Sequence, residues 1–335
     1  MEKREYMQIP GPTNVPLRLL KVLATQPMDH RGDEFETLVK KCITGLQEIF
    51  RTENDILIYP SSGSGMLEAS IVNLFSRGDS ILVASMGVFS ERMGLIAEAH
   101  GLKVIRSSKN WGQSVKADEI KAILKEDKEF LIKGVCVPQN ETATGVKNDI
   151  EAISKVIKEL NHPALFIVDA VSSLACMPFE NDKWNVDIAI CASQKGLMLP
   201  PGMGMVSVSE KAWQAVSKST LPKWYWDYNM ARKRLKSFRF TYTPATSLLI
   251  GLGEAIDIIR EEGLESIWAR HELVAKAVRA SAKAMGLELL AEEGFESDTI
   301  TAILLPEEID YEEFAELIKS KYGITIGGGL EQFDG

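Results

Sequence analysis

Short apolar runs that alternate with amphipathic helical segments fill residues 55–209 and constrain the fold more than any other feature. Helical patterns such as 116–125 and 149–160, the latter starting with a capping residue at Asn148, lie between most of these runs. Strands that alternate with helices form βαβ units and a mostly parallel sheet. The sequence therefore predicts a large α/β domain with a seven-stranded-type sheet flanked by helices. The predicted strands are 56–59, 80–84, 103–105, 133–137, 165–168, 188–191 and 205–208.

The pattern changes after about residue 245. Two long helices are expected over 247–260 and 264–285, followed by short strands at 287–290 and 299–304 and a helix over 311–321. The chain has 335 residues, which exceeds the usual length of a domain with a single hydrophobic core. We expect an N-terminal segment (1–15), a large domain (16–245) and a smaller C-terminal α+β domain (246–335).

Composition excludes several classes of function. The formal net charge of −9 disfavours binding to nucleic acid or to an anionic membrane, which needs clustered Lys and Arg. No apolar run approaches the ~20 residues of a membrane span, and residues 1–5 lack the apolar core of a signal peptide, so we expect neither feature. The four cysteines show no CxxC spacing, so we expect reduced thiols and a cytoplasmic protein. The four histidines are scattered and predict no metal site.

Two charged residues follow apolar runs where a sheet edge is expected. Asp169 ends the run 165–168, and Lys195 follows the run 188–191. Ligands of open α/β sheets bind at the carboxyl ends of the strands. Pyridoxal phosphate needs a lysine for its aldehyde and an acid against its pyridine nitrogen. Taken singly, Asp169 could instead cap a helix and Lys195 could be a lysine that extends to solvent at a strand end.

Two loops strengthen this interpretation. The turn 61–65 (Ser-Ser-Gly-Ser-Gly) precedes a helix, whose free N–H groups and neighbouring hydroxyls suit an anion. Alone it could be a plain turn, since it matches neither a P-loop nor a dinucleotide fingerprint. After Lys195, the Pro-Pro-Gly sequence at 200–202 predicts a stiff loop, which favours a functional site.

Several segments together resemble the class V pyridoxal-phosphate-dependent aminotransferases of fold type I. The most specific are Ser-Gln-Lys-Gly at 193–196 with 200–202, and Asp-Ala-Val-Ser-Ser at 169–173. The nearest branch is that of the alanine–glyoxylate and serine–glyoxylate aminotransferases. Further matching segments are 10–13, 62–65, 67–69, 140–145 and 243–245.

The resemblance implies a role for each candidate residue. Lys195 would be the Schiff-base lysine and Asp169 the partner of the pyridine nitrogen, while Val171 and Phe89 would pack on the two ring faces. Gly11 and the N-terminal segment would line the substrate pocket. The remaining cofactor contacts would be Ser62, Gly63, Ser64 and Gln194 at the phosphate, Thr142 near the ring hydroxyl, and Thr243 at the phosphate of a neighbouring subunit.

The implied activity is transfer of the amino group of a small amino acid, alanine or serine, to glyoxylate or pyruvate, by a homodimer with shared active sites. A second hypothesis keeps the cofactor but predicts a lyase or desulfurase. Desulfurases commonly carry His before the lysine and a mobile cysteine, whereas this chain has Gln194 and no cysteine in an obvious exposed loop. A third is a non-catalytic subunit that retains the fold.

The sequence departs from the family at two positions. Phe240 stands where some relatives carry a phosphate-binding tyrosine. The arginine that binds the substrate carboxylate would come after Gly335, so we expect a truncated chain. The alternatives are a substitute such as Arg31 or Arg239, or impaired activity. The aromatic stretch 224–228 is expected near the dimer contact.

Overall fold

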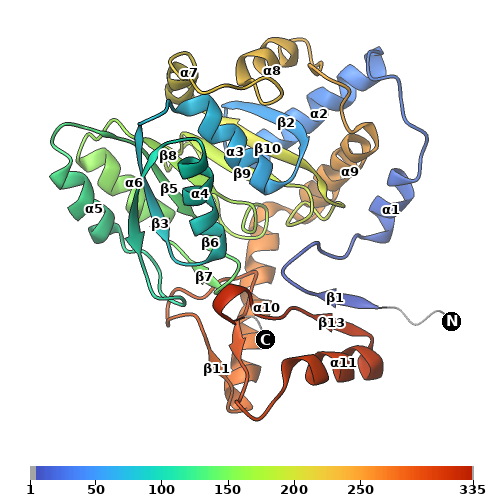
Figure 1. The fold of residues 1–335 in the computed structure, drawn as a ribbon. Coiled ribbons are helices and arrows are strands. Elements are labelled where there is room, and N and C mark those ends of the chain that lie inside the picture. The colour runs from blue at the N-terminus through green and yellow to red at the C-terminus, as the bar shows by residue number, and fades with distance from the viewer. Residues whose placement is uncertain (1–4, 334–335) are drawn as a thin grey trace.

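A computed structural model describes residues 5–333, and its centre is a seven-stranded sheet of order β2-β10-β9-β8-β5-β3-β4 (Figure 1). Every neighbouring pair is parallel except those of β10, which runs antiparallel to β2 and to β9. The predicted α/β fold with a mostly parallel sheet is confirmed. The strands are β2 (Asp55–Ser61), β3 (Ser80–Ser85), β4 (Lys103–Ser108), β5 (Ile132–Pro138), β8 (Leu165–Asp169), β9 (Ile188–Ala192) and β10 (Gly202–Val208).

Helices cover both faces of the sheet, because the central strands are apolar on both sides. Along β8, Phe166 and Val168 join one core, and Leu165 and Ile167 join the other. The first core lies against α2 (Asp33–Phe50), α5 (Ala117–Glu126), α6 (Ile150–Glu159) and α9 (Thr246–Glu262). The second lies against α3 (Gly63–Leu74), α4 (Val88–Ala99), α7 (Glu210–Val216) and α8 (Tyr228–Leu235).

The start of α6 corrects one expectation. The capping residue is Asp149, whose carboxylate accepts a hydrogen bond from the N–H of Ala152 at 2.9 Å. The predicted cap, Asn148, is buried, and its amide bonds to the N–H of Val115 and the carbonyl of Pro138. Both residue types suit a helix start, and the tertiary contacts of Asn148 decide between them.

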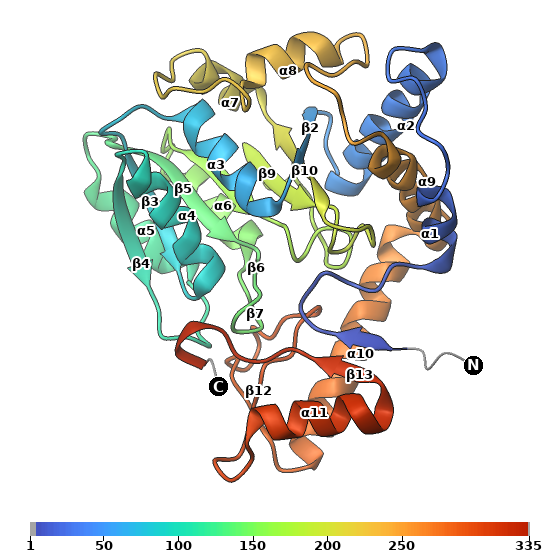
Figure 2. The ribbon, with the colours of Figure 1, turned by 45° about the vertical axis from the view of Figure 1, so that its right-hand side comes forward.

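The C-terminal region forms a smaller layer below the sheet, as Figures 1 and 2 show. Its long helices are α10 (Leu264–Ala284) and α11 (Tyr311–Tyr322). The strands are shorter than expected: β11 (Glu288–Leu289) pairs with β12 (Ile303–Leu304). Strand β13 (Ile324–Ile326) pairs in parallel with β1 (Tyr6–Gln8), and this pairing brings the N-terminal segment to the C-terminal layer. Helix α1 (Leu17–Leu23) follows this segment. None of the helices within 5–333 has the length and apolarity needed to span a bilayer.

Helix α9 begins where the second domain is predicted to begin, yet it packs on α1 and α2. The two helices α2 and α9 approach closely at Gly45. A Cβ atom added at Gly45 would lie 2.4 Å from Cγ2 of Ile256 on α9. This contact ties the predicted C-terminal domain to the large one.

The substitution Gly45→Ala should lower the thermal unfolding midpoint, because the new methyl group clashes with the branched, buried side chain of Ile256. Overpacking of this kind costs roughly 1–3 kcal/mol, more than the gain in helix propensity. Gly94→Ala on α4 is the matched control, since its nearest neighbour is the flexible end of Arg106 at 3.3 Å. Circular dichroism melting curves that show equal midpoints for Gly45→Ala and wild type would contradict the close packing.

Candidate functional site

The two residues singled out in the sequence meet at the carboxyl edge of the sheet. Strands β8 and β9 are parallel neighbours, with Asp169 opposite Ile190, so Asp169 and the segment after β9 lie at the same edge. Asp169 is only 9 % exposed, and its Oδ1 accepts a hydrogen bond from the N–H of Val171 at 2.9 Å. Lys195 lies in the turn after β9 and is half-buried.

Burial shifts the pKa of both groups toward their neutral forms. It raises the pKa of the Asp169 carboxyl to about 6, although the Val171 N–H and the charges of Arg92 and Lys195 oppose the shift. Burial also lowers the pKa of the Lys195 ammonium, against the attraction of Asp169. A lysine with a lowered pKa holds more of the neutral amine that attacks an aldehyde.

The N-terminal segment covers Lys195. The Nζ of Lys195 donates a hydrogen bond to the carbonyl of Pro10, and the N–H of Thr13 donates to the carbonyl of Gln194 at 3.2 Å. Gly11 lies against the lysine: a Cβ atom there would be 2.6 Å from Nζ. The predicted pocket residue Gly11 and the predicted lysine are therefore brought together.

The turn 61–65 leads into α3, as predicted. Ser62 caps the helix, and its Oγ accepts a hydrogen bond from the N–H of Gly65 at 3.4 Å. Gly63 packs on Val171, since a Cβ atom there would lie 2.7 Å from Cγ2 of the valine. The turn and the loop after β8 are thus in direct contact.

Polar groups without partners test whether a cofactor fits. The Oε1 atom of Gln194 is buried and makes no hydrogen bond within the described part of the chain. A buried polar atom without a partner is costly, so its side-chain amide suits a ligand that comes with hydrogen-bonding groups of its own. The Ser62 turn, Asp169 and Lys195 are the residues that could hold the phosphate, the ring nitrogen and the aldehyde of pyridoxal phosphate, with the Gln194 amide beside them.

Arg92 is a residue of the candidate site that the sequence did not predict. Its guanidinium lies 4.7 Å from the ring centroid of Phe89, and its Nη1 donates a hydrogen bond to Oγ of Ser64 at 2.9 Å. It therefore links the predicted stacking residue to the predicted phosphate turn. A helical spacing of three residues between Phe89 and Arg92 was the available signal.

Thr142 is buried beside a second missed residue, Glu141. Both belong to a hairpin of β6 (Asn140–Glu141) and β7 (Val146–Lys147). The carboxylate of Glu141 is fully buried and accepts hydrogen bonds from the N–H groups of Phe89, Ser90 and Ala143. This carboxylate joins the Thr142 hairpin to the start of α4.

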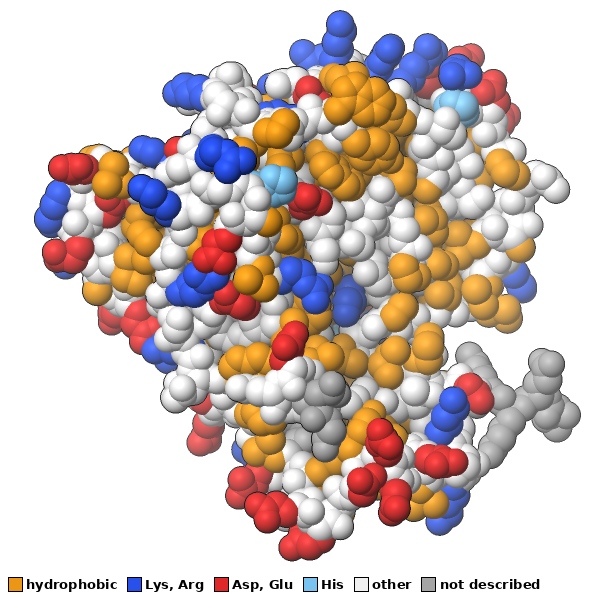
Figure 3. All heavy atoms as spheres, viewed as in Figure 1, with side chains coloured by type: hydrophobic (Ala, Val, Ile, Leu, Met, Phe, Trp, Pro, Cys, Tyr) orange, Lys and Arg blue, Asp and Glu red, His pale blue; other side chains and the backbone are white. Residues whose placement is uncertain are grey.

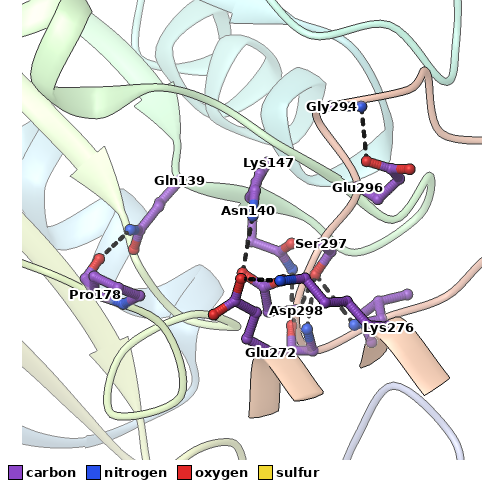
Figure 4. A network of polar contacts seen from close by, with 12 residues as sticks. Gln139, Asn140, Lys147, Pro178, Glu272, Lys276, Gly294, Glu296, Ser297 and Asp298 are labelled. Carbon is purple, nitrogen blue, oxygen red and sulfur yellow. Dashed lines mark hydrogen bonds and ion pairs between the residues drawn. The ribbon is translucent and has the colours of Figure 1, made fainter. Parts of the chain in front are cut away.

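The hairpin is anchored to the C-terminal region by polar contacts (Figure 4). Lys147 pairs with Asp298 at 2.9 Å, and its backbone N–H donates to the carbonyl of Phe295. The N–H of Ser297 donates to the carbonyl of Gly145 at 2.8 Å. The second layer therefore supports the sheet edge from below.

Other predicted residues lie apart from this group. Thr243 is exposed in the loop between α8 and α9, and Phe240 packs on Phe35 with ring centroids 6.1 Å apart. Arg239 pairs with Glu36 at the surface, and Arg31 is exposed, so neither is joined to Lys195.

The aromatic stretch 224–228 forms a cluster near α8. Tyr242 stacks between Trp224 and Tyr225, with both centroid distances 5.0 Å, and Trp226 packs edge-on against Tyr59 of β2. Trp224 is 70 % exposed. Figure 3 shows hydrophobic side chains gathered on this part of the surface and along the flank over α1 and α9.

Comparison with known proteins places this geometry in a family. The family model described as aminotransferase class-V matches residues 16–331. The chain is 40 % identical to serine–glyoxylate aminotransferase of Methylorubrum extorquens, over 99 % of this chain and 84 % of that protein. It is 39 % identical to L-aspartate–glyoxylate aminotransferase of Paracoccus denitrificans, over all of this chain and 85 % of that protein.

A solved structure agrees with both relatives. The crystal structure of alanine–glyoxylate aminotransferase from Nostoc sp. superposes with a TM-score of 0.93 at 27 % identity, covering all of this chain and 89 % of that chain. The family model matches nearly the whole chain, and Asp169 and Lys195 lie at the same edge of the sheet after β8 and β9. The chain therefore belongs to the class V aminotransferases, which depend on pyridoxal phosphate.

Proposed function

We propose that this protein transfers the amino group of a small amino acid to glyoxylate, or to a similar 2-oxo acid such as pyruvate. The observation that carries the proposal is the meeting of a half-buried Lys195 and a buried Asp169 at one sheet edge, beside the Ser62 turn. Relatives named as serine–glyoxylate and aspartate–glyoxylate aminotransferases support glyoxylate as the acceptor. Alanine and serine are the proposed donors.

Each residue has a proposed part in this chemistry. Pyridoxal phosphate, when bound, supplies an aldehyde for the amine and an electron-withdrawing ring. Asp169 holds the ring nitrogen, and Lys195 carries the cofactor and moves the proton at the substrate Cα. The proposed ring and phosphate contacts are Val171, Phe89 and Thr142, and Ser62, Gly63, Ser64 and Gln194, with Gly11 at the substrate.

The cysteines favour aminotransfer over desulfuration. A desulfurase needs an accessible thiolate, but Cys42, Cys136 and Cys191 are buried. The fourth, Cys176, is partly exposed, and burial of its thiol raises its pKa to about 12. Thiols in this state are poor nucleophiles, and their reduced form supports the proposed cytoplasmic location.

We also propose a homodimer with shared sites, in which Thr243 reaches the phosphate of the neighbouring subunit. The exposed side chains of Leu17 and Leu20 on α1, and of Trp224 in the aromatic stretch, support an interface that includes these surfaces. The proposed division into residues 1–15, 16–245 and 246–335 is kept, with α9 as the helix that joins the last two parts.

Lys195→Ala should abolish the visible absorbance band of bound pyridoxal phosphate and lower kcat for serine and glyoxylate by about 10²–10⁴-fold, because the proton at Cα loses its carrier. Spectra of protein supplied with the cofactor, and glycine formation followed by chromatography, would measure both effects. Arg239→Ala, at the surface pair with Glu36, is the control that should keep both. If the wild type forms no glycine from any small amino acid while the cofactor is bound, the proposed reaction is wrong.

Cofactor affinity should fall as pH drops below about 6, because the Asp169 carboxyl, with its pKa raised to about 6, is then protonated and cannot pair with a protonated ring nitrogen. Each pH unit below that value should weaken binding by up to about tenfold. Titrations of wild type and Asp169→Asn across pH 5–8 separate this effect from the phosphate's own titration, which both proteins share. Equal pH profiles for the two proteins would contradict the role of Asp169.

A further inference from the structure

Helix α4 begins without a capping side chain of its own. The residue at its N-cap is Gly87, so no local side chain can accept the free N–H groups of the first turn. Ser90, the third residue of the helix, faces the other way: its Oγ accepts from the N–H groups of Met86 and Gly87. The N–H groups of Phe89 and Ser90 need an acceptor from elsewhere.

Glu141 supplies that acceptor from a distant part of the chain. Its Oε2 lies 2.8 Å from the N of Ser90, and its Oε1 lies 3.3 Å from the N of Phe89 and 3.1 Å from the N of Ala143. The carboxylate is fully buried, with no exposed surface. A buried charge is tolerated when it is well hydrogen-bonded, and a helix N-terminus favours a negative charge.

The contact of Glu141 with α4 requires glycine at position 87, because a side chain there would clash with Glu141. The φ of 170° at Gly87 is extended backbone, which any residue adopts. A Cβ atom at Gly87 would lie 2.5 Å from Cγ and 2.6 Å from Cδ of Glu141. Because Gly87 has no side chain, the Glu141 carboxylate can occupy the space beside the N-cap. Gly87 and Glu141 therefore form a single helix cap from two segments that are distant in the sequence.

The cap lies between two residues of the proposed cofactor site. Phe89, the proposed stacking residue, is the second residue of α4, and Thr142 follows Glu141 directly. We propose that Glu141 is a positioning residue, which caps α4 across the hairpin and so holds Phe89 where it stacks on the cofactor ring. This inference rests on the proposed function.

The surroundings make this support rigid. The hairpin that carries Glu141 is fastened from below by the pair of Lys147 with Asp298 and by the backbone bond of Ser297 to Gly145. On the other side, Arg92 packs on the Phe89 ring and bonds to Ser64. Without its cap, the first turn of α4 frays and must become ordered again when the cofactor binds. The free energy that this ordering costs weakens cofactor binding.

A rescue experiment tests the inference. Glu141→Ala should weaken pyridoxal phosphate binding by roughly five- to thirtyfold, the range expected for a lost helix cap. It should also reduce the visible circular dichroism of the bound cofactor and the hydrogen-exchange protection of the Ser90 amide. Adding Gly87→Ser to Glu141→Ala fills the vacated room with a local cap and should restore all three quantities at least in part.

Two comparisons make the outcome specific. Gly87→Ser alone should weaken cofactor binding, because the new Cβ atom displaces the Glu141 side chain. Each single substitution is therefore expected to weaken binding, whereas the double variant recovers it. Glu119→Ala is the matched control: Glu119 accepts from the N–H of Lys116 at the start of α5, outside the site, and its loss should leave cofactor affinity unchanged.

The results separate the inference from the function beneath it. Unchanged affinity in Glu141→Ala, or a double variant no better than the single one, would overturn the positioning role even if the wild type is an active aminotransferase. If the wild type itself does not bind pyridoxal phosphate, the proposed function fails and the inference falls with it, while exchange at Ser90 still reports on the cap.

Discussion

The parallel pairing of β8 with β9 is the constraint on which the rest of the site depends. Because the two strands run in the same direction in one sheet, their carboxyl ends meet, and the residues after them share one edge. Asp169 and the turn of Lys195 are neighbours for this reason alone. The apolar strands beneath them bury that edge on both faces, so a charge placed there is costly unless it has a partner.

That cost explains the chemistry of the site. Desolvation raises the pKa of Asp169 and lowers that of Lys195, so each group is moved toward its neutral form. The buried Oε1 of Gln194 has no partner among the described residues. A cationic ring nitrogen suits the Asp169 carboxyl and an aldehyde suits the Lys195 amine, so one cofactor that carries both groups fits the edge.

Prediction from sequence was most successful for features set by local patterns. The strands and helices of the sheet region follow from hydrophobic periodicity, and the sites of Asp169 and Lys195 follow from where apolar runs end. It failed where two residue types were locally equivalent, as at the cap of α6, where Asp149 rather than Asn148 serves. Arg92 and Glu141 were missed because their roles arise from contacts across 28 and 51 residues of chain.

The sequence by itself determined the fold class and the pair of residues at its centre, since strand periodicity and the order of βα units are local properties of the chain. The tertiary structure alone decided how the site is supported. It placed Pro10 and Gly11 on Lys195, put Gly63 against Val171, and brought the Glu141 carboxylate into the space left by Gly87. Contacts of this kind depend on the packing of distant segments, and packing at a few ångströms leaves no periodic signal in a sequence.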